Sequence, residues 1–439
     1  MSRPSLARWT DDDTPTDRQQ WSVMVGGDTV FTETSPPEIG DELQEAIARA
    51  DLSLANLEAP ISGAGMPISK VGPVNETVAE TPLHLRDMGF DAVTLANNHA
   101  MDHGSEGLRH TIEQCTSAGL DTCGAGESPS AALDPLSASV AGHSVAVINV
   151  CEREFGTTDR GGPGTGWIDH PDVTARIADA ATTADSVVVV AHGGLEYLPV
   201  PPLDHQRRLR EFADAGASLV VSHHPHVPQG WEQYRGTPIC YSLGNFRYKR
   251  GTRPKTEWGL LVDATFSGDA VAFMGERWEV SEYQRYFDRV SRITADRETL
   301  RAHWQEVAVR VFEQRYGPWL RTATGSDLPS LLRHPLQYLR GDRLWDGDKR
   351  QRELLTLLNL VRNESHRDLI QTALAVKTGT CPEQRSDEVR DTVRELLEWT
   401  EDRPVYDRPS SAGRLVDGVL GRLQGAVSRT GSRLRPNLS

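Results

Sequence analysis

The chain has 439 residues, of which 38% are hydrophobic and 25% charged. This length predicts more than one structural unit, and the composition excludes collagen-like, coiled-coil and wholly disordered chains. The 62 acidic residues outnumber the 47 basic residues, which gives a net charge of −15. Such a surface repels phosphate backbones, so we expect no nucleic-acid partner. Only five of the basic residues are lysines, which fits either a salt-rich cytoplasm or a GC-rich genome that favours arginine.

The five cysteines are scattered and form no Cys-x-x-Cys pair. This pattern predicts reduced thiols and argues against a disulfide framework or a zinc ribbon. Residues 1–20 form a polar leader without an apolar segment, and no run of about 18 apolar residues occurs further along. We therefore expect a cytoplasmic protein; the sequence leaves its oligomeric state open.

Seven short apolar runs, rich in Val, Ile and Leu and without polar alternation, predict strands that are covered on both faces. They are Ser22–Gly26, Leu52–Ala55, Ala92–Ala96, Val145–Val150, Val187–Ala191, Leu219–Ser222 and Ile239–Leu243. Between them, Pro82–Met88, Gly107–Ala118 and Leu203–Ala215 fit helices. Leu260–Phe266 and Ala270–Met274 predict a closing hairpin. This alternation predicts one α/β domain over residues 21–282.

The pattern changes over residues 283–400, where apolar residues recur three or four positions apart. Leu300–Tyr316, Leu354–Val361 and Val389–Trp399 carry this spacing, which predicts an added all-α domain. Residues 401–439 form a tail that is basic from Ser410 onward and has apolar residues at helical spacing. Two interpretations of this tail stay open: peripheral contact with an anionic membrane surface, or a flexible tail weakened by its glycines.

Polar side chains follow six of the seven predicted strands. They are Asp28, Glu58, the group Asn97, Asn98 and His99, then His192, the group His223, His224 and His226, and Asn245. Ligands of open α/β sheets bind beyond the carboxyl ends of the strands. Any one of these residues could be an ordinary cap or turn former. Their coincidence at one edge therefore predicts a metal site.

The expected metal ligands share oxygen or imidazole donors and include no thiolate: Asp28, Glu58, Asn98, His192, His224 and His226. This donor set suits one or two Mn, Fe or Zn ions, and Mg is compatible. His224 and His226 stand one residue apart. On an extended segment they would point to opposite sides, which favours two neighbouring metals. Such a centre can act on a phosphoester or on an amide.

His99 is the expected general acid, because it neighbours a ligand and imidazole titrates near neutral pH. Asp102 would orient it, or simply cap a helix. We expect Asn97, His223 and Asn245 to contact the substrate.

Cationic side chains gather near the predicted site in this acidic chain: Lys70, Arg247, Lys249 and Lys255. They predict a cationic rim that receives an anionic small molecule or polymer by focusing the local field. The alternative is an ordinary solvated loop.

The succession GGDTVF, NLEAPIS, ANNHAMDHG, GAGES, HGGLEY, DAGASLVVSHHPHVPQG and YSLGNF resembles the CapA family of capsule-synthesis proteins, over about residues 22–266. That resemblance implies an association with poly-γ-glutamate capsules. It also implies a four-layer αββα fold similar to the calcineurin-like metallophosphoesterases. Asn98-His99 and His224-Pro225-His226 resemble two motifs of those enzymes, whereas Val30 replaces a histidine and Glu58 an aspartate of two others.

We therefore expect a metal-dependent hydrolase-like protein that acts on a phosphoester, or on an amide bond of an anionic polymer or peptide such as γ-linked glutamate. The alternative is a non-catalytic accessory protein that binds polymer or a membrane-bound synthase. Capsule-assembling members of the family are usually anchored in the membrane near the N-terminus, and we expect no such anchor here. A ligating transferase has little support, because no Gly-x-x-x-x-Gly-Lys-[Ser/Thr] loop occurs.

Overall fold

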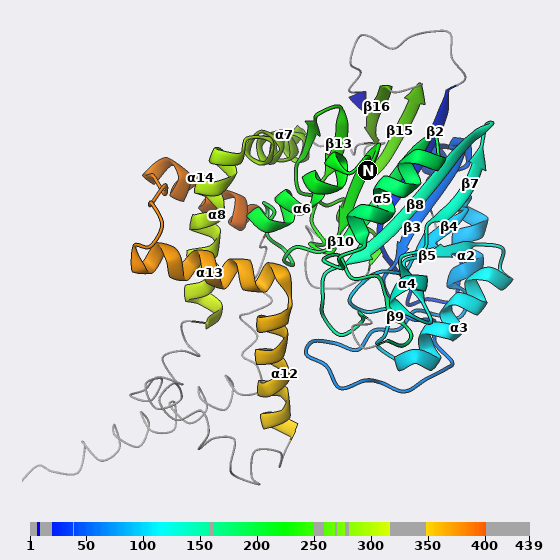
Figure 1. Cartoon of the computed structure of the whole chain (residues 1–439), viewed down its shortest axis with the longest axis horizontal. Helices are drawn as coiled ribbons and strands as arrows, with labels where there is room; N and C mark the ends of the chain where they lie inside the picture. Colours follow the sequence, from blue (N-terminus) through cyan, green and yellow to red (C-terminus); the bar gives the residue numbers. More distant parts are fainter. Residues whose placement is uncertain are drawn as a thin grey trace, which may run out of the picture. The chain divides into compact units, whose positions relative to one another are not determined.

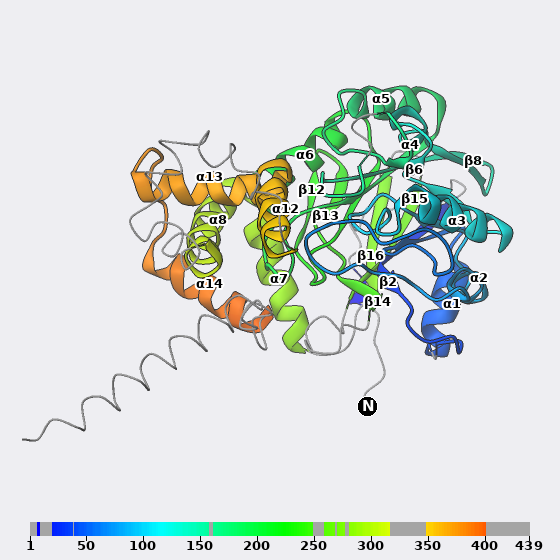
Figure 2. The same ribbon diagram turned by 90° about the horizontal axis from the view of Figure 1, so that it is seen from below.

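Two β-sheets lie face to face in the computed structural model, and helices cover the outer face of each (Figures 1 and 2). The predicted four-layer αββα arrangement is thereby confirmed. The structure describes residues 7–8, 20–37, 39–157, 161–248, 259–267, 270–276, 281–316 and 348–400. Described residues up to Thr400 belong to one compact unit. The predicted basic tail, Lys249 and Lys255 lie outside the described residues.

The first sheet has eight strands in the order β1-β16-β15-β2-β3-β4-β5, with β14 also paired to β2. Strands β2 to β5 run parallel, and β15 and β16 form the predicted antiparallel hairpin. The bounds are β1 Ala7–Arg8, β2 Trp21–Val30, β3 Leu52–Leu57, β4 Ala92–Thr94, β5 Asp121–Cys123, β14 Asn245–Tyr248, β15 Leu261–Ser267 and β16 Ala270–Glu276.

The second sheet has six strands in the order β12-β13-β11-β10-β8-β7. The bounds are β7 Leu136–Val140, β8 His143–Cys151, β10 Ser186–His192, β11 Leu219–His223, β12 Trp231–Tyr234 and β13 Thr237–Cys240, and β6 Ala125–Gly126 pairs separately with β9 Gly164–Thr165. The seventh predicted strand ends at Cys240, earlier than expected. The chain then crosses to the first sheet, where Asn245 pairs with Asp28 across β14 and β2.

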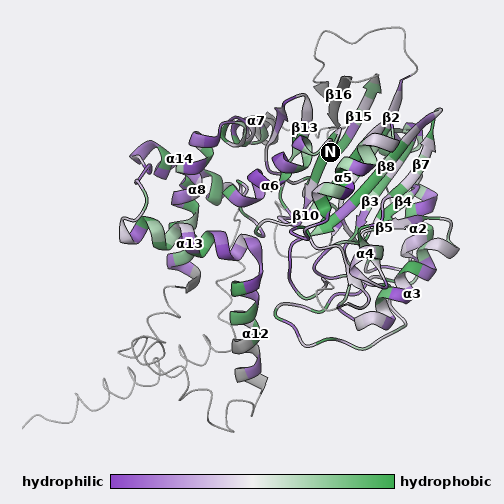
Figure 3. Ribbon diagram, viewed as in Figure 1, coloured by the Kyte–Doolittle hydropathy of each residue, from purple (hydrophilic) through white to green (hydrophobic). Residues whose placement is uncertain are grey.

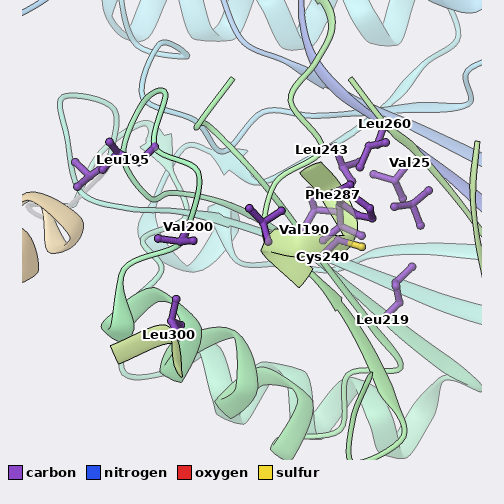
Figure 4. Packing of buried hydrophobic residues seen from close by; sticks show 14 of the residues in the cluster. Val25, Val190, Leu195, Val200, Leu219, Cys240, Leu243, Leu260, Phe287 and Leu300 are labelled. Carbon is purple, nitrogen blue, oxygen red and sulfur yellow. The ribbon is translucent and has the colours of Figure 1, made fainter. Parts of the chain in front are cut away.

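Alternating side chains along each strand build the layers, because successive residues of a strand face opposite sides of its sheet. Val25 of β2 and Val190 of β10 belong to the cluster between the sheets, and Figure 4 shows them together with Leu219. Their neighbours Met24 and Val189 belong instead to the clusters under the outer helices. The strands are therefore apolar on both faces over most of their length, and Figure 3 shows β8 largely in the hydrophobic colour.

Five helices cover the outer faces of the sandwich. Ile47, Leu85 and Cys115 anchor three of them on the first sheet, and Ile177 and Leu209 anchor two on the second. The bounds are α1 Asp41–Arg49, α2 Thr81–Met88 and α3 Gly104–Ser117 on the first sheet, α5 Val173–Thr183 and α6 Leu203–Asp214 on the second, with a short α4 at Pro129–Ala132. Each helix has one apolar stripe, which is the pattern of a helix packed on a core.

Helices follow the sandwich from Ser281 onward, close to the predicted change at residue 283. They are α7 Ser281–Ala295, α8 Arg297–Val311 continuing as a π-helix over Phe312–Tyr316, α12 Asp348–Arg362, α13 Glu364–Thr378 and α14 Asp387–Thr400. Phe287, Trp304 and Leu369 belong to the same buried cluster as Val25 (Figure 4 shows Phe287). The helices and the sandwich thus share one continuous core.

All five cysteines are free thiols, as predicted, and burial raises the pKa of Cys115 and Cys123 to about 12. Among the described helices, none combines the length and the apolar character needed to cross a membrane.

A buried carboxylate of α13 caps the start of α6 and makes stability depend on pH. Asp368 Oδ2 accepts the backbone N–H of Asp204 in the first turn of α6, at 3.2 Å. Burial, and then the charge of Asp204, raise the pKa of Asp368 to about 6. The folded protein therefore holds this proton at a pH where the unfolded chain has released it. Stability from this group is complete below pH 4 and is lost as the pH rises through 6.

We expect the free energy of unfolding of the wild type, relative to Asp368→Asn, to fall by about 2 kcal/mol between pH 4 and pH 7. The asparagine carboxamide stays neutral and so does not titrate. Urea unfolding of both proteins across this range measures the difference. Parallel curves for the two proteins would contradict the assignment to Asp368.

Candidate metal centre and active site

The carboxyl ends of strands from both sheets converge on one buried cluster of polar side chains. Asp28 near the end of β2 and Glu58 just after β3 come from the first sheet, and His192 at the end of β10 and His224 just after β11 come from the second. Asp28 Oδ2 accepts the backbone N–H of His224 at 3.2 Å, and Glu58 Oε1 lies 3.6 Å from His192 Nε2. The predicted meeting of strand ends therefore occurs, but between two sheets and not along the edge of one.

Two overlapping groups of side chains could each hold a metal ion. One consists of Glu58, His192 and His224, and the other of Asp28, Glu58 and His226. Within each group the ligand atoms lie within 4.8 Å of one another, and all these side chains are buried. Glu58 belongs to both groups, so it is the residue through which two neighbouring ions would be connected.

Asp28 is held as a carboxylate despite complete burial. Asn56 Nδ2 donates to its Oδ1 at 2.7 Å, and His226 Nδ1 lies 3.3 Å from its Oδ2. Burial alone would raise the pKa of Asp28, but the hydrogen bond and charge of His226, with the charge of His192, outweigh it and lower that pKa. The position therefore favours a negative charge, which a cation needs from its ligand.

His192 lies in an environment that favours the neutral imidazole, the form that binds metals. Burial, followed by the charge of His224, lowers the pKa of His192 well below its usual value. Nε2 of His192 lies 3.2 Å from His224 Nδ1 and 3.1 Å from Asn98 Oδ1. The imidazoles and this carboxamide oxygen thus point at a common space.

The backbone around the site is strained. His224 and His226 have φ angles of 102° and 57°, in the left-handed region that side-chain-bearing residues rarely adopt. Our expectation of an extended segment was therefore wrong, because two left-handed residues bend the chain here. The two rings still enter different groups. Such strain persists where the surrounding structure enforces it, and it clusters at functional sites.

One glycine is required for the approach of the two strands that carry the site. A Cβ at Gly27 would lie 2.1 Å from the carbonyl oxygen of Gly244. That contact permits the hydrogen bond from Asp28 N to Gly244 O, at 3.1 Å, and it places Asn245 beside Asp28.

The donor set fits a divalent cation. It offers two carboxylates and three imidazoles without a thiolate, which suits Mn, Fe or Zn. Nε2 of His226 is buried and has no hydrogen-bond partner among the described residues, so this nitrogen is available to a ligand. Leaving a buried polar atom without a partner costs free energy, and binding a metal would relieve that cost.

A second polar group surrounds His99, next to the metal groups. Asp102 Oδ2 accepts from Nδ1 of His99 at 2.7 Å, and Asp102 Oδ1 accepts from the Lys70 ammonium at 2.5 Å. Asn75 donates its backbone N–H to Asp102, and its Nδ2 lies 3.1 Å from His99 Nε2 and 2.6 Å from the Tyr248 hydroxyl. Burial would raise the pKa of Asp102, but His99 and Lys70 hold it below its usual value.

The expected substrate-contacting residues lie in several environments. Asn97 is buried and donates to Leu57 O at 2.8 Å, so it joins the ends of β3 and β4. His223 is buried, and burial lowers its pKa. Asn245 Oδ1 lies 2.8 Å from His226 Nδ1, and Arg247 is half-buried on β14. Lys70 is buried on Asp102 and does not form part of an exposed rim.

Sequence reasoning missed several residues of the site, among them Asn56, Asn75, Glu154 and Tyr248. Asn56 and Glu154 carry a signal that could have been used, since each stands two residues from an acid at a strand end. Glu154 accepts from Asn98 Nδ2 at 3.2 Å. Asn75 comes from a loop without periodicity, so nothing in the sequence connects it to His99.

Comparison with known proteins places the chain in a family. The description "Bacterial capsule synthesis protein PGA_cap" matches residues 13–249, which is more than half of the chain. The chain belongs to this family. The match includes the residues of both metal groups and the His99 group, and it confirms the resemblance to CapA proteins. Residues 250–439 lie outside the matched range.

Two curated relatives carry the family name. "PGA biosynthesis protein CapA" of Bacillus subtilis (strain 168) is 40% identical over 181 residues, covering 40% of this chain and 47% of that protein. "Capsule biosynthesis protein CapA" of Bacillus anthracis is 35% identical over 186 residues, covering 40% and 44%. The chain thus spans about half the length of these relatives. A solved 5'-nucleotidase precursor from Thermus thermophilus aligns over 66% of this chain and 60% of its own, with 13% identity and a TM-score of 0.37.

Proposed function

We propose that this member of the capsule-synthesis family is a metal-dependent hydrolase. Its substrate would be a phosphoester, or an amide bond of an anionic polymer or peptide such as γ-linked glutamate. The observation that carries the proposal is the shared carboxylate of Glu58, which belongs to two three-residue groups able to hold a cation, beside a histidine hydrogen-bonded to a buried carboxylate.

The side chains divide into roles by what they touch. Asp28, Glu58, His192, His224 and His226 would hold one or two divalent cations. A bound cation would supply Lewis-acid polarisation of a phosphoryl or carbonyl oxygen. Asn98 lies beside these ligands, because its Oδ1 is 3.1 Å from His192 Nε2.

His99 is the group placed to move a proton. Nδ1 of His99 is hydrogen-bonded to Asp102, so Nε2 is the nitrogen that faces the half-exposed Asn75. A positioned imidazole of this kind can donate to a leaving group. Lys70 and Asp102 act through His99, because both contact it and are themselves buried.

An assay with two substrates tests the proposal and separates its two chemistries. The purified chain would be loaded with Mn²⁺ and offered p-nitrophenyl phosphate and, separately, γ-linked oligoglutamate. We expect one of them to be turned over, with p-nitrophenol or new amino groups as the readout, and at least roughly 100-fold less turnover in His224→Ala. His84→Ala serves as the matched control, since His84 is a buried histidine whose Nε2 lies 3.1 Å from Thr34 O and which belongs to neither metal group.

The outcomes separate an enzyme from an accessory protein. Turnover lost in His224→Ala and kept in His84→Ala supports the hydrolase. Binding of oligoglutamate without turnover of either substrate would overturn it in favour of a polymer-binding accessory protein. A wild-type chain that retains no divalent metal would remove the basis of the proposal.

A further inference from the structure

The N-terminus of α13 is buried against the segment that follows β8. Ser365 donates its hydroxyl to Glu152 Oε1 at 2.6 Å, and its backbone N–H lies 3.3 Å from Glu152 Oε2. Asn363, the cap residue of the helix, adds its Nδ2 at 3.4 Å from the same oxygen. A carboxylate from the sandwich thus satisfies the first turn of a helix more than 200 residues away in the chain.

A second carboxylate makes the reciprocal contact, from α13 to the sandwich. Glu364 Oε2 accepts the backbone N–H of Arg153 at 2.8 Å, and its Oε1 accepts Trp167 Nε1 at 2.9 Å. Both Glu152 and Glu364 are buried. Burial, and then the charge of Glu152, raise the pKa of Glu364. Nη1 of Arg208 on α6 lies 3.6 Å from Glu152 Oε1, and this ion pair offsets part of the cost of burying two acids side by side.

The segment 152–154, which these two carboxylates join to α13, also contacts the candidate metal centre. Glu152 donates its backbone N–H to His192 O at 2.9 Å, and a Cβ at Gly193 would lie 2.6 Å from Glu152 Cγ. Two residues further on, Glu154 accepts from Asn98 Nδ2 at 3.2 Å. The segment 152–154 therefore lies between α13 on one side and, on the other, the side chain of Asn98 and the backbone of His192.

We infer that α13 is a positioning element of the metal centre, in which Ser365 and Glu364 hold the segment 152–154 so that Asn98 and His192 face the ions. This inference rests on the proposed metal site. It assigns a role to helices that lie beyond the matched family range. Outer groups that orient metal ligands typically change metal affinity by roughly 10–100-fold when they are removed.

Ser365→Ala in the full chain tests the inference, because it removes the 2.6 Å bond and little else. We expect Mn²⁺ to bind roughly 10–100-fold more weakly in a titration. Hydrogen exchange of the Glu152 amide, which donates to His192 O, should become faster. Glu364→Gln replaces one of the two carboxylate oxygens that accept from Arg153 N and Trp167 Nε1. It should also weaken Mn²⁺ binding and speed exchange of the Glu152 amide.

Asp296→Ala is the matched control. Asp296 caps α8, a helix that packs on α13, by accepting Thr299 N at 2.8 Å, so its loss weakens the start of a neighbouring helix without touching the segment 152–154. A purely structural role for Ser365 predicts equal stability losses in both variants and an unchanged Mn²⁺ affinity, and that result would overturn the inference.

The same experiment separates this inference from the proposed function. A wild type that binds no Mn²⁺ refutes the metal centre. In that case the exchange rate of the Glu152 amide, compared between the variants and the wild type, decides whether α13 holds the segment 152–154. Unchanged exchange in both Ser365→Ala and Glu364→Gln contradicts the positioning role whatever the metal result.

Discussion

Replacing Glu58 by glutamine is expected to abolish both metal groups at once. Glu58 is the one residue common to the two groups, and a neutral carboxamide gives up the charge that offsets two cations. Loss of an outer orienting group costs about 10–100-fold in metal affinity. We therefore expect loss of this inner carboxylate to weaken Mn²⁺ binding by more than about 100-fold. Metal analysis after dialysis measures the result.

Single-group variants give the comparison that makes this prediction specific. His192→Ala disrupts the group with His224, and His226→Ala disrupts the group with Asp28. Each should lower the bound metal by about half where two ions bind, whereas Glu58→Gln should remove nearly all of it. The prediction fails if Glu58→Gln retains as much metal as the two histidine variants.

The edge at which the site forms could be predicted because the strands are apolar on both faces. Such strands leave polar side chains only at their ends, and parallel strands bring those ends together. Asp28, Glu58, His192 and His224 lie at or just after the ends of four strands in this way. The pattern could not show that these strands belong to two sheets, since both sheets present the same kind of apolar run.

The groups around those ligands could not be predicted, because they come from segments without periodicity or from distant parts of the chain. Lys70 and Asn75 lie in the loop after β3 and reach Asp102 from there. The Lys70 ammonium looked available to a substrate in the sequence, yet it is buried on a carboxylate. Ser365 stands 213 positions from Glu152, a distance over which no local pattern can indicate contact.

Replacing His99 by asparagine is expected to slow turnover by about 10²–10⁴-fold, on whichever of the two assay substrates the wild type turns over, while the metal stays bound. The factor is that of a lost general acid. The metal groups contain neither His99 nor Asp102, so their ligands remain in place. Turnover and metal content would be measured on the same preparation, since a loss of both would assign His99 to the metal centre.

Replacing Asp102 or Lys70, which contact His99, should lower turnover by a smaller factor than replacing His99 itself. Asp102→Asn and Lys70→Met leave the imidazole present but remove what fixes its Nδ1, so each should lower kcat less than His99→Asn and leave KM nearly unchanged. His103→Ala is the control, because Nε2 of this neighbouring histidine lies 4.0 Å from the Glu76 carboxylate and its side chain is not part of the hydrogen bonds around His99 described above. Equal losses in His103→Ala and His99→Asn would show that the loop, and not the imidazole, carries the effect.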